Sequence, residues 1–140
     1  MHRAAPLVAG TVAGALFVWL AVGLGFVNYD TLFNLTWGDE VVHGGDPRLG
    51  LPLAPTPKPL VIAAGGLLSP LGHGAQPIVA IGALLALGAL GAAAALLAWH
   101  FAGWPAAVLA AVLVLTREPV LSFGVRAYID IPYAALVLLA

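Results

Sequence analysis

Two long stretches of this chain carry no charged residue, and they limit its fold more than any other feature. Residues 4–27 and 78–97 are apolar almost throughout, and a helix needs about 20 such residues to cross a membrane. Charged residues form only 8% of the 140 residues, whereas a typical soluble domain has roughly 25%. The sequence therefore predicts an all-α fold, that of a polytopic helical membrane protein. The formal net charge of −1 argues against a nucleic-acid-binding surface.

The first apolar stretch admits two interpretations. A cleaved signal peptide would use Arg3 as its basic end and the small residues Ala13 and Ala15 as its cleavage region. The apolar run continues well past that region to Val27, which is longer than the core of a signal peptide. We therefore expect a retained span at about 4–27, with Arg3 holding the N-terminus in the cytoplasm.

The segment 28–76 is expected to form an outer loop that carries two short amphipathic helices at the membrane surface. The first helix, at about 31–43, places Asn34, Asp39 and Glu40 among apolar residues, and these polar residues are assigned to its solvated face. Asp30 precedes this helix, at the position of an N-cap.

The second short helix, at about 60–71, decides the topology. It has 12 residues, too few for a comfortable span. If it stays on one side, the later spans return Asp130 to the same side as Asp30. If it crosses the membrane, the two aspartates lie on opposite sides, and we expect the first arrangement.

Further spans are expected at 77–98 and 104–123, and another begins at about 131. Glycine and alanine residues of the first of these give it a smooth face, on which another helix can pack closely. The last apolar run reaches Ala140 after only ten residues, about half a span. We therefore expect residues 1–140 to be the N-terminal part of one larger transmembrane domain.

The basic residues fall on the side of the membrane that usually has few of them. In the expected topology the outer side holds four of the five Lys and Arg residues, namely Arg48, Lys58, Arg117 and Arg126. Cations near membrane level usually have an anionic partner. That partner is either a ligand such as a lipid phosphate or the neighbouring carboxylates of Asp46 and Glu118.

The order of these features resembles the N-terminal part of the C-type integral membrane glycosyltransferases. The nearest branch contains the protein mannosyltransferases and the lipid A aminoarabinose transferases (family 39-like). In that family the first outer loop opens with Asp, often followed by Glu, and continues to a Gly-Asp and a Lys-Pro element. Here these places are taken by Asp30, by Gly45-Asp46 at 15 and 16 residues further on, and by Lys58-Pro59-Leu60.

A second motif extends the resemblance to the end of the chain. The run GVRAYIDIPYAALVLLA supplies the aspartate of the second outer loop, Asp130, with its flanking proline and aliphatic helix. The sequence departs from the family pattern at Thr31, which replaces the Glu. The family also has an aromatic residue four positions after the Asp, whereas here Phe33 comes three positions after Asp30.

The resemblance implies transfer of a sugar from a polyprenyl-phosphate donor to an acceptor hydroxyl outside a plasma membrane, expected to be bacterial. Asp30 and Asp130 are the implied catalytic residues, and Asp30 is the candidate general base because an acceptor hydroxyl must lose its proton. Positive charge stabilises the departing phosphate. The implied substrate-binding residues are Lys58, Arg126, Arg117 and Asp46. Direct displacement would invert the anomeric carbon, and this chain alone is expected to be inactive.

No cofactor is assigned. Some members of the superfamily use a divalent cation, which Asp30 and Asp130 would hold, and others use none. The histidines are scattered without the spacing of a zinc site. The expected partners are the polyprenyl-linked sugar, an acceptor of unknown class and membrane lipid.

Each assignment has a structural alternative. Asp30 and Asp130 also suit helix caps, and Arg126 can pair with Asp130 one helical turn away. The rival function is a transporter or channel segment in which the two aspartates handle ions. A transporter would be expected to hold its charges at mid-membrane, whereas here the sequence puts them near the ends of spans. A non-catalytic scaffold subunit would not need the long outer loop.

Overall fold

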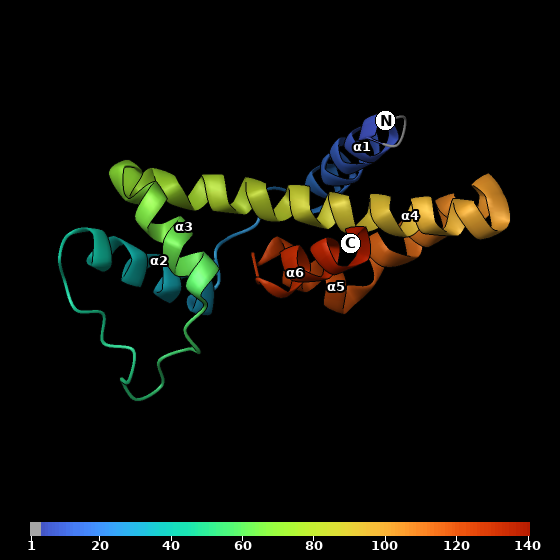
Figure 1. Cartoon of the computed structure of the whole chain (residues 1–140). Helices are drawn as coiled ribbons and strands as arrows, with labels where there is room; N and C mark the ends of the chain where they lie inside the picture. Colours follow the sequence, from blue (N-terminus) through green and yellow to red (C-terminus); the bar gives the residue numbers. More distant parts are fainter. Residues whose placement is uncertain (1–3) are drawn as a thin grey trace.

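The computed structural model describes residues 4–140, and all regular structure in this range is helical, with no strand. The predicted all-α fold is thus confirmed, while Arg3 and its topological role lie outside the described residues. The elements in chain order are α1 (Ala4–Val22), α2 (Tyr29–Val42), α3 (Pro59–Leu68), the 3-10 helix η1 (Ser69–Gly74), α4 (Ala75–Thr116), α5 (Glu118–Val125) and α6 (Asp130–Leu139). Figure 1 shows α4 as the longest, central element, against which α1, α5 and α6 lie.

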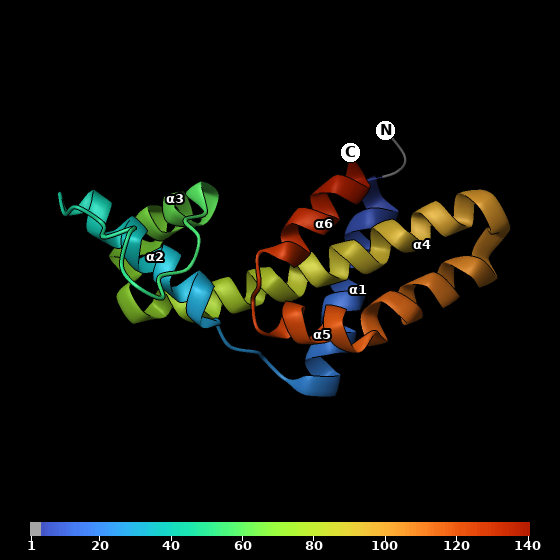
Figure 2. The ribbon, with the colours of Figure 1, turned by 90° about the horizontal axis from the view of Figure 1, so that it is seen from below.

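Helix α4 reverses direction at Gly103 and forms a hairpin of two arms. Gly103 has φ +78° and ψ −172°, a conformation that glycine adopts far more readily than other residues. Figure 2 shows the second arm returning beside the first. Leu115 of the second arm accordingly lies against Gly91 of the first. The hairpin lets two apolar stretches pack together after a tight turn.

The second arm is interrupted halfway back. Arg117 has an extended backbone, with ψ of 119°, and Pro119 lies in the first turn of α5, where its missing N–H costs no hydrogen bond. The predicted span 104–123 is therefore two helical pieces, the second arm of α4 and α5.

A compact core forms where α1 crosses the first arm of α4. It consists of buried apolar side chains of α1, both arms of α4 and α6: Ala15, Val18, Leu84, Leu87, Leu115 and Ile131. The two helices approach closely because a Cβ on Gly88 would collide with the carbonyl oxygen of Thr11 and the backbone nitrogen of Ala15. Small residues permit such close approach between helices in membranes.

Helices α2 and α3 pack as a separate pair beside the beginning of α4 (Figures 1 and 2). Glycines again set the spacing, since a Cβ on Gly38 would meet the carbonyl oxygen of Ile62 and one on Gly65 would meet that of Leu35. The pair thus joins the two short helices expected at 31–43 and 60–71.

Two boundaries differ from those expected. Helix α1 ends at Val22 instead of Val27, because Gly23 takes φ +81°, and the chain then continues without regular structure to Asn28. The second short helix ends at Leu68, and η1 with Pro70 leads from it into α4.

Two helical stretches are long and apolar enough to cross a membrane, namely Ala4–Val22 and Pro59–Thr116, and a third if the bent pair of α5 and α6 counts as one span. Large apolar side chains also face outward, for example Leu20 on α1 and Leu109 on α4. An exposed apolar surface of this kind marks contact with a membrane or with another protein. The fold is consistent with a location in a membrane.

Candidate functional site

Three segments that are distant in the sequence meet at the beginning of α2. We call this place the three-segment junction and define it by residues 28–34, 56–58 and 126–130. Its centre is polar although it is buried: the side chains of Asn28, Thr31 and Asn34 are 4%, 5% and 0% exposed. Buried polar groups are tolerated only when they are hydrogen-bonded, and each of these three is.

Asn28 begins α2 and ties it to the segment after α5. The Asn28 Oδ1 accepts from the backbone N–H of Thr31 at 3.1 Å, so Asn28 is the N-cap. Its Nδ2 donates to the carbonyl oxygen of Arg126 at 2.8 Å. The alternative in which Asp30 caps the helix was therefore wrong. Asn28 accepts from an open N–H group of the first turn, and Asp30 lies within that turn.

Backbone bonds strengthen the same connection. The N–H of Asn28 donates to the carbonyl oxygen of Arg126 at 3.0 Å, and Thr31 Oγ1 donates to that of Ala127 at 2.8 Å. Thr31 stands where the family pattern has Glu. In this chain it serves as a buried link between α2 and the segment after α5.

Asn34 holds the third segment. Its Oδ1 accepts from the backbone N–H of Lys58 at 2.6 Å, while its Nδ2 donates to the carbonyl oxygens of Asp30 at 2.8 Å and Thr56 at 3.5 Å. Asn34 was expected on the solvated face of α2. It is instead completely buried, because the loop returns across it and needs a partner for its own backbone.

Four of the six candidate residues belong to this junction. Asp30 and Lys58 are half-buried, and Arg126 and Asp130 are exposed. Asp30 and Lys58 are linked through the amide of Asn34. Arg126 is linked to α2 by the carbonyl that binds Asn28, and Asp130 begins α6 three residues after Ala127. The junction therefore brings together the backbone segments that carry two carboxylates and two cations.

Arg126 does not pair with a carboxylate. Its guanidinium carbon lies 5.9 Å from the ring centre of Phe26 and 5.5 Å from that of Tyr128, within the range of a cation–π contact. Across residues 4–140, the one acid–base contact within 4 Å joins His43 Nδ1 to Asp39 Oδ1 at 3.5 Å. The alternatives in which Asp46, Glu118 or Asp130 neutralise the cations are therefore not realised in this part of the chain.

The other two candidates lie elsewhere. Arg117 is at the opposite end of α5 from Arg126. It follows Leu115, whose side chain packs near Gly14 in the middle of α1. Arg117 thus lies near the middle of the bundle, because the second arm of α4 breaks halfway back. It was expected on the outer side, together with Arg126. Asp46 lies in the exposed loop after α2, away from Asp30.

Asp39 also differs from its expected role on a solvated face. It is half-buried and accepts a hydrogen bond from the hydroxyl of Ser69, at the end of α3. This bond joins the far ends of α2 and α3, so Asp39 has a structural function.

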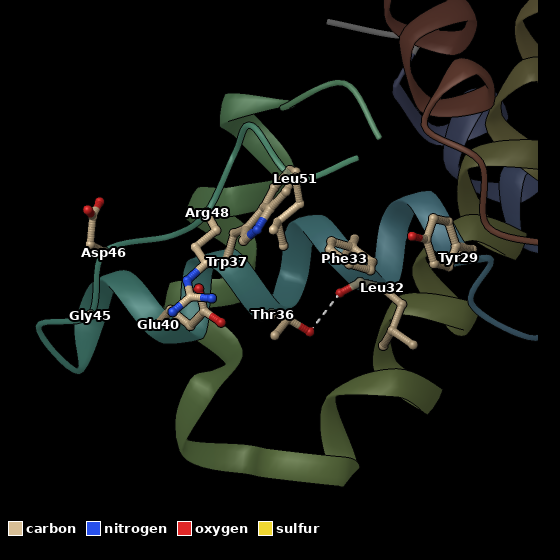
Figure 3. Close-up of a pocket in the computed structure, with 10 residues that line it drawn as sticks. All are labelled: Tyr29, Leu32, Phe33, Thr36, Trp37, Glu40, Gly45, Asp46, Arg48 and Leu51. Atoms are coloured by element: carbon tan, nitrogen blue, oxygen red, sulfur yellow. Dashed lines mark hydrogen bonds between the residues drawn. The ribbon is translucent and has the colours of Figure 1, made fainter. Parts of the chain in front are cut away.

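A pocket of about 510 Å³ lies along the other side of α2, beneath the loop 45–51. Figure 3 shows three aromatic residues of α2 lining it in succession, Tyr29, Phe33 and Trp37. Their neighbouring ring centres are 4.9 and 5.5 Å apart. The loop is held over the pocket by Tyr29, whose hydroxyl donates to the carbonyl oxygen of Leu53 at 3.3 Å.

Sequence reasoning missed the importance of Asn28 and Asn34. A signal existed for Asn28, since Asn is among the best N-cap residues and precedes the helix directly. No local signal existed for Asn34, because its partners at Thr56 and Lys58 lie 22 and 24 residues away.

Within residues 4–140, no group of three or more His, Asp or Glu residues is arranged so that it could hold a metal ion. Comparisons of the chain with protein-family models, with curated proteins and with solved structures find no match.

Proposed function

We propose that this chain forms part of a polyprenyl-phosphate-dependent glycosyltransferase of a plasma membrane, with its active site on the extracytoplasmic side. The observation that carries the proposal is the three-segment junction. Asp30, Lys58, Arg126 and Asp130 come from three separate segments, yet hydrogen bonds of the buried side chains of Asn28, Thr31 and Asn34 hold those segments together. If these four charged residues served only to form ion pairs with one another, the three segments would not need to be held together in this way.

The chemistry needs both kinds of charge. The acceptor oxygen forms a bond to the anomeric carbon of the donor, the bond from that carbon to the phosphate oxygen breaks, and the acceptor proton moves to a carboxylate. Asp30 is half-buried and supplies that carboxylate as general base. Lys58 and Arg126, which have no acidic partner within 4 Å among the described residues, stabilise the negative charge on the departing polyprenyl phosphate.

Replacement of Asp30 by Asn tests the base. Asp30 contributes its backbone carbonyl to the junction, so the Asp30→Asn change keeps that hydrogen bond and removes only the charge. We expect turnover in the complete enzyme to fall about 10²- to 10⁴-fold, with normal membrane insertion. Asp39→Asn is the matched control, since Asp39 binds Ser69 at the far end of α2. Transfer at the wild-type rate by Asp30→Asn would refute the role of the base.

The phosphate contacts are tested separately. Lys58→Gln and Arg126→Gln should raise the Michaelis constant for the polyprenyl donor about 10- to 100-fold, and that for the acceptor much less, because only the donor carries the phosphate. Equal effects on both substrates would indicate that the two cations act on the fold.

One observation favours the rival function, a transporter or channel segment. Arg117 and Glu118 are exposed and follow Leu115, which packs near the middle of α1. Ionisable residues at such a level often mark a pathway. Ion flux into liposomes that disappears in Glu118→Gln would support this alternative, whereas the absence of flux together with sugar transfer would exclude it.

A further inference from the structure

The pocket beneath the loop 45–51 has features that the transfer chemistry does not use. Its floor is the aromatic row of Tyr29, Phe33 and Trp37, and one end is bordered by Glu40 and Arg48. From Tyr29 to Glu40 the helix rises about 16 Å, which is longer than a single sugar ring. The pocket is therefore an elongated groove with an aromatic floor and a polar end.

Trp37 has a hydrogen-bond donor that the described chain does not use. Its side chain is only 2% exposed, and its indole N–H donates to no group of residues 4–140 in the structure. No fully covered side-chain nitrogen in that range lacks a partner, so the indole nitrogen retains an opening. Trp37 also lines this pocket, so a ligand bound there would change the surroundings of the indole ring.

Three charged residues line the pocket, Glu40, Asp46 and Arg48. Figure 3 shows the carboxylate of Asp46 apart from the other two charged groups, which lie at the polar end. In Figure 3 the side chain of Arg48 extends toward Glu40, but their charged atoms do not come within 4 Å, and neither has another ion pair in the described chain. A guanidinium offers five donors and a carboxylate offers two acceptor oxygens. Together they suit a ligand that carries neighbouring donor and acceptor groups.

These features restrict the class of ligand. A lipid chain would cover Glu40 and Arg48 without satisfying them, which costs free energy. An anionic ligand would be repelled by the carboxylate of Glu40, and a cationic ligand would be repelled by the guanidinium of Arg48. A neutral sugar has faces of C–H groups that pack on aromatic rings and a rim of hydroxyls that both donate and accept.

We propose that the groove formed by Tyr29, Phe33, Trp37, Glu40 and Arg48 binds a neutral oligosaccharide. Its acceptor role rests on the proposed function: Asp30, which would take the hydroxyl proton, follows Tyr29 in the first turn of α2 but does not line the groove, so a terminal sugar would have to extend past Tyr29 to reach it. The acceptor class would then be a glycan. Its oxygen bonds to the donor's anomeric carbon, polyprenyl phosphate leaves, and the proton passes to Asp30.

Binding can be measured without any transfer. The chain is embedded in phosphatidylcholine nanodiscs, because glucoside detergents would compete for the groove. Of the four indole signals expected from the four tryptophans in a ¹⁵N–¹H spectrum, Trp37→Phe identifies the one from Trp37. A neutral glucose- or mannose-based trisaccharide should move this signal saturably and leave the other three unmoved.

Variants and related sugars test the assignment. Arg48→Ala, Glu40→Gln and Phe33→Leu should each weaken binding about 10- to 100-fold. Phe101→Ala, an exposed aromatic residue outside the pocket, should not. A uronic-acid or glucosamine trisaccharide that binds as tightly as the neutral ones would overturn the proposed class. The absence of any neutral sugar that moves the Trp37 signal would overturn the site.

The outcome is separable from that of the proposed function. If the Trp37 signal responds to neutral sugar but Asp30→Asn transfers normally, the sugar-binding groove stands and the assigned base fails. If wild-type enzyme transfers sugar but no neutral oligosaccharide binds, only the groove is refuted.

Discussion

At the scale of single residues, the junction depends on one buried amide more than on any of the charged candidates. Asn34 makes three hydrogen bonds, and two of them, to Thr56 and Lys58, connect α2 to the loop in front of α3. Removing a buried partner leaves the opposite groups unsatisfied, which usually costs about 1–3 kcal/mol per group. The charged residues at the surface of the junction have no comparable effect on the fold, since exposed charges contribute little.

Asn34→Ala should therefore lower the free energy of unfolding by about 1–3 kcal/mol and release the loop between α2 and α3. Thermal unfolding in micelles measures the first effect, and the rate of tryptic cleavage after Arg48 measures the second. Thr36→Ala is the control on the same helix, because Thr36 is exposed and bonds only to the carbonyl of Leu32. Unchanged cleavage in Asn34→Ala would mean that other contacts hold the loop.

At the scale of helices, close packing through glycine determines how α1 lies on α4. Gly88→Ala would force a Cβ against the backbone of Thr11 and Ala15, and we expect a loss of about 1–3 kcal/mol. Gly82 is in the same arm, and a Cβ there would meet nothing within 4 Å. Gly82→Ala should be neutral or stabilising by up to about 1 kcal/mol. Thermal unfolding of the pair in micelles tests this, and equal losses would refute packing as the cause.

The helices themselves could be predicted because apolar runs of this length have few other solutions in a membrane protein. Their ends could not. Helix α1 ends five residues early, just before Gly23, which takes φ +81°, and the chain after it is held beside the end of α5, where the N–H of Phe26 donates to the carbonyl of Val125. That partner lies about 100 residues further along the chain, and no local pattern contains it.

The candidate site was predictable only in part, because the sequence shows which residues follow one another but not which side chains join the segments. Asp30, Lys58 and Asp130 were selected by their order along the chain, and the structure brings their segments together. The residues that join these segments, Asn28, Thr31 and Asn34, form bonds that only the folded chain creates. Arg117 was misplaced because a break within a helical arm cannot be located from apolar composition alone.

At the scale of the whole molecule, the helices define two ends. One end holds Asn28 and Arg126, which are directly hydrogen-bonded. The turn at Gly103 marks the other, since contacts between Gly91 and Leu115 show the arms running back from it. If α1 crosses the membrane with its beginning inside, the junction faces the outside and the turn faces the cytoplasm. Residues 58–74 then stay on the outer side, because Lys58 is bound to Asn34 and α4 begins directly after Gly74.

Single cysteines can test this arrangement, because the chain has no native cysteine. A membrane-impermeant maleimide applied to intact cells should label Thr56→Cys and Tyr128→Cys. It should label His100→Cys, next to the turn, only after the membrane is opened. All three replacements avoid the buried core, so the fold should be preserved. Labelling of Thr56→Cys without Tyr128→Cys would separate Asp30 from Asp130 and remove the basis of a shared site. Labelling of His100→Cys from outside would mean that the hairpin does not cross the membrane. The placement of the junction and the turn on opposite sides would then be refuted.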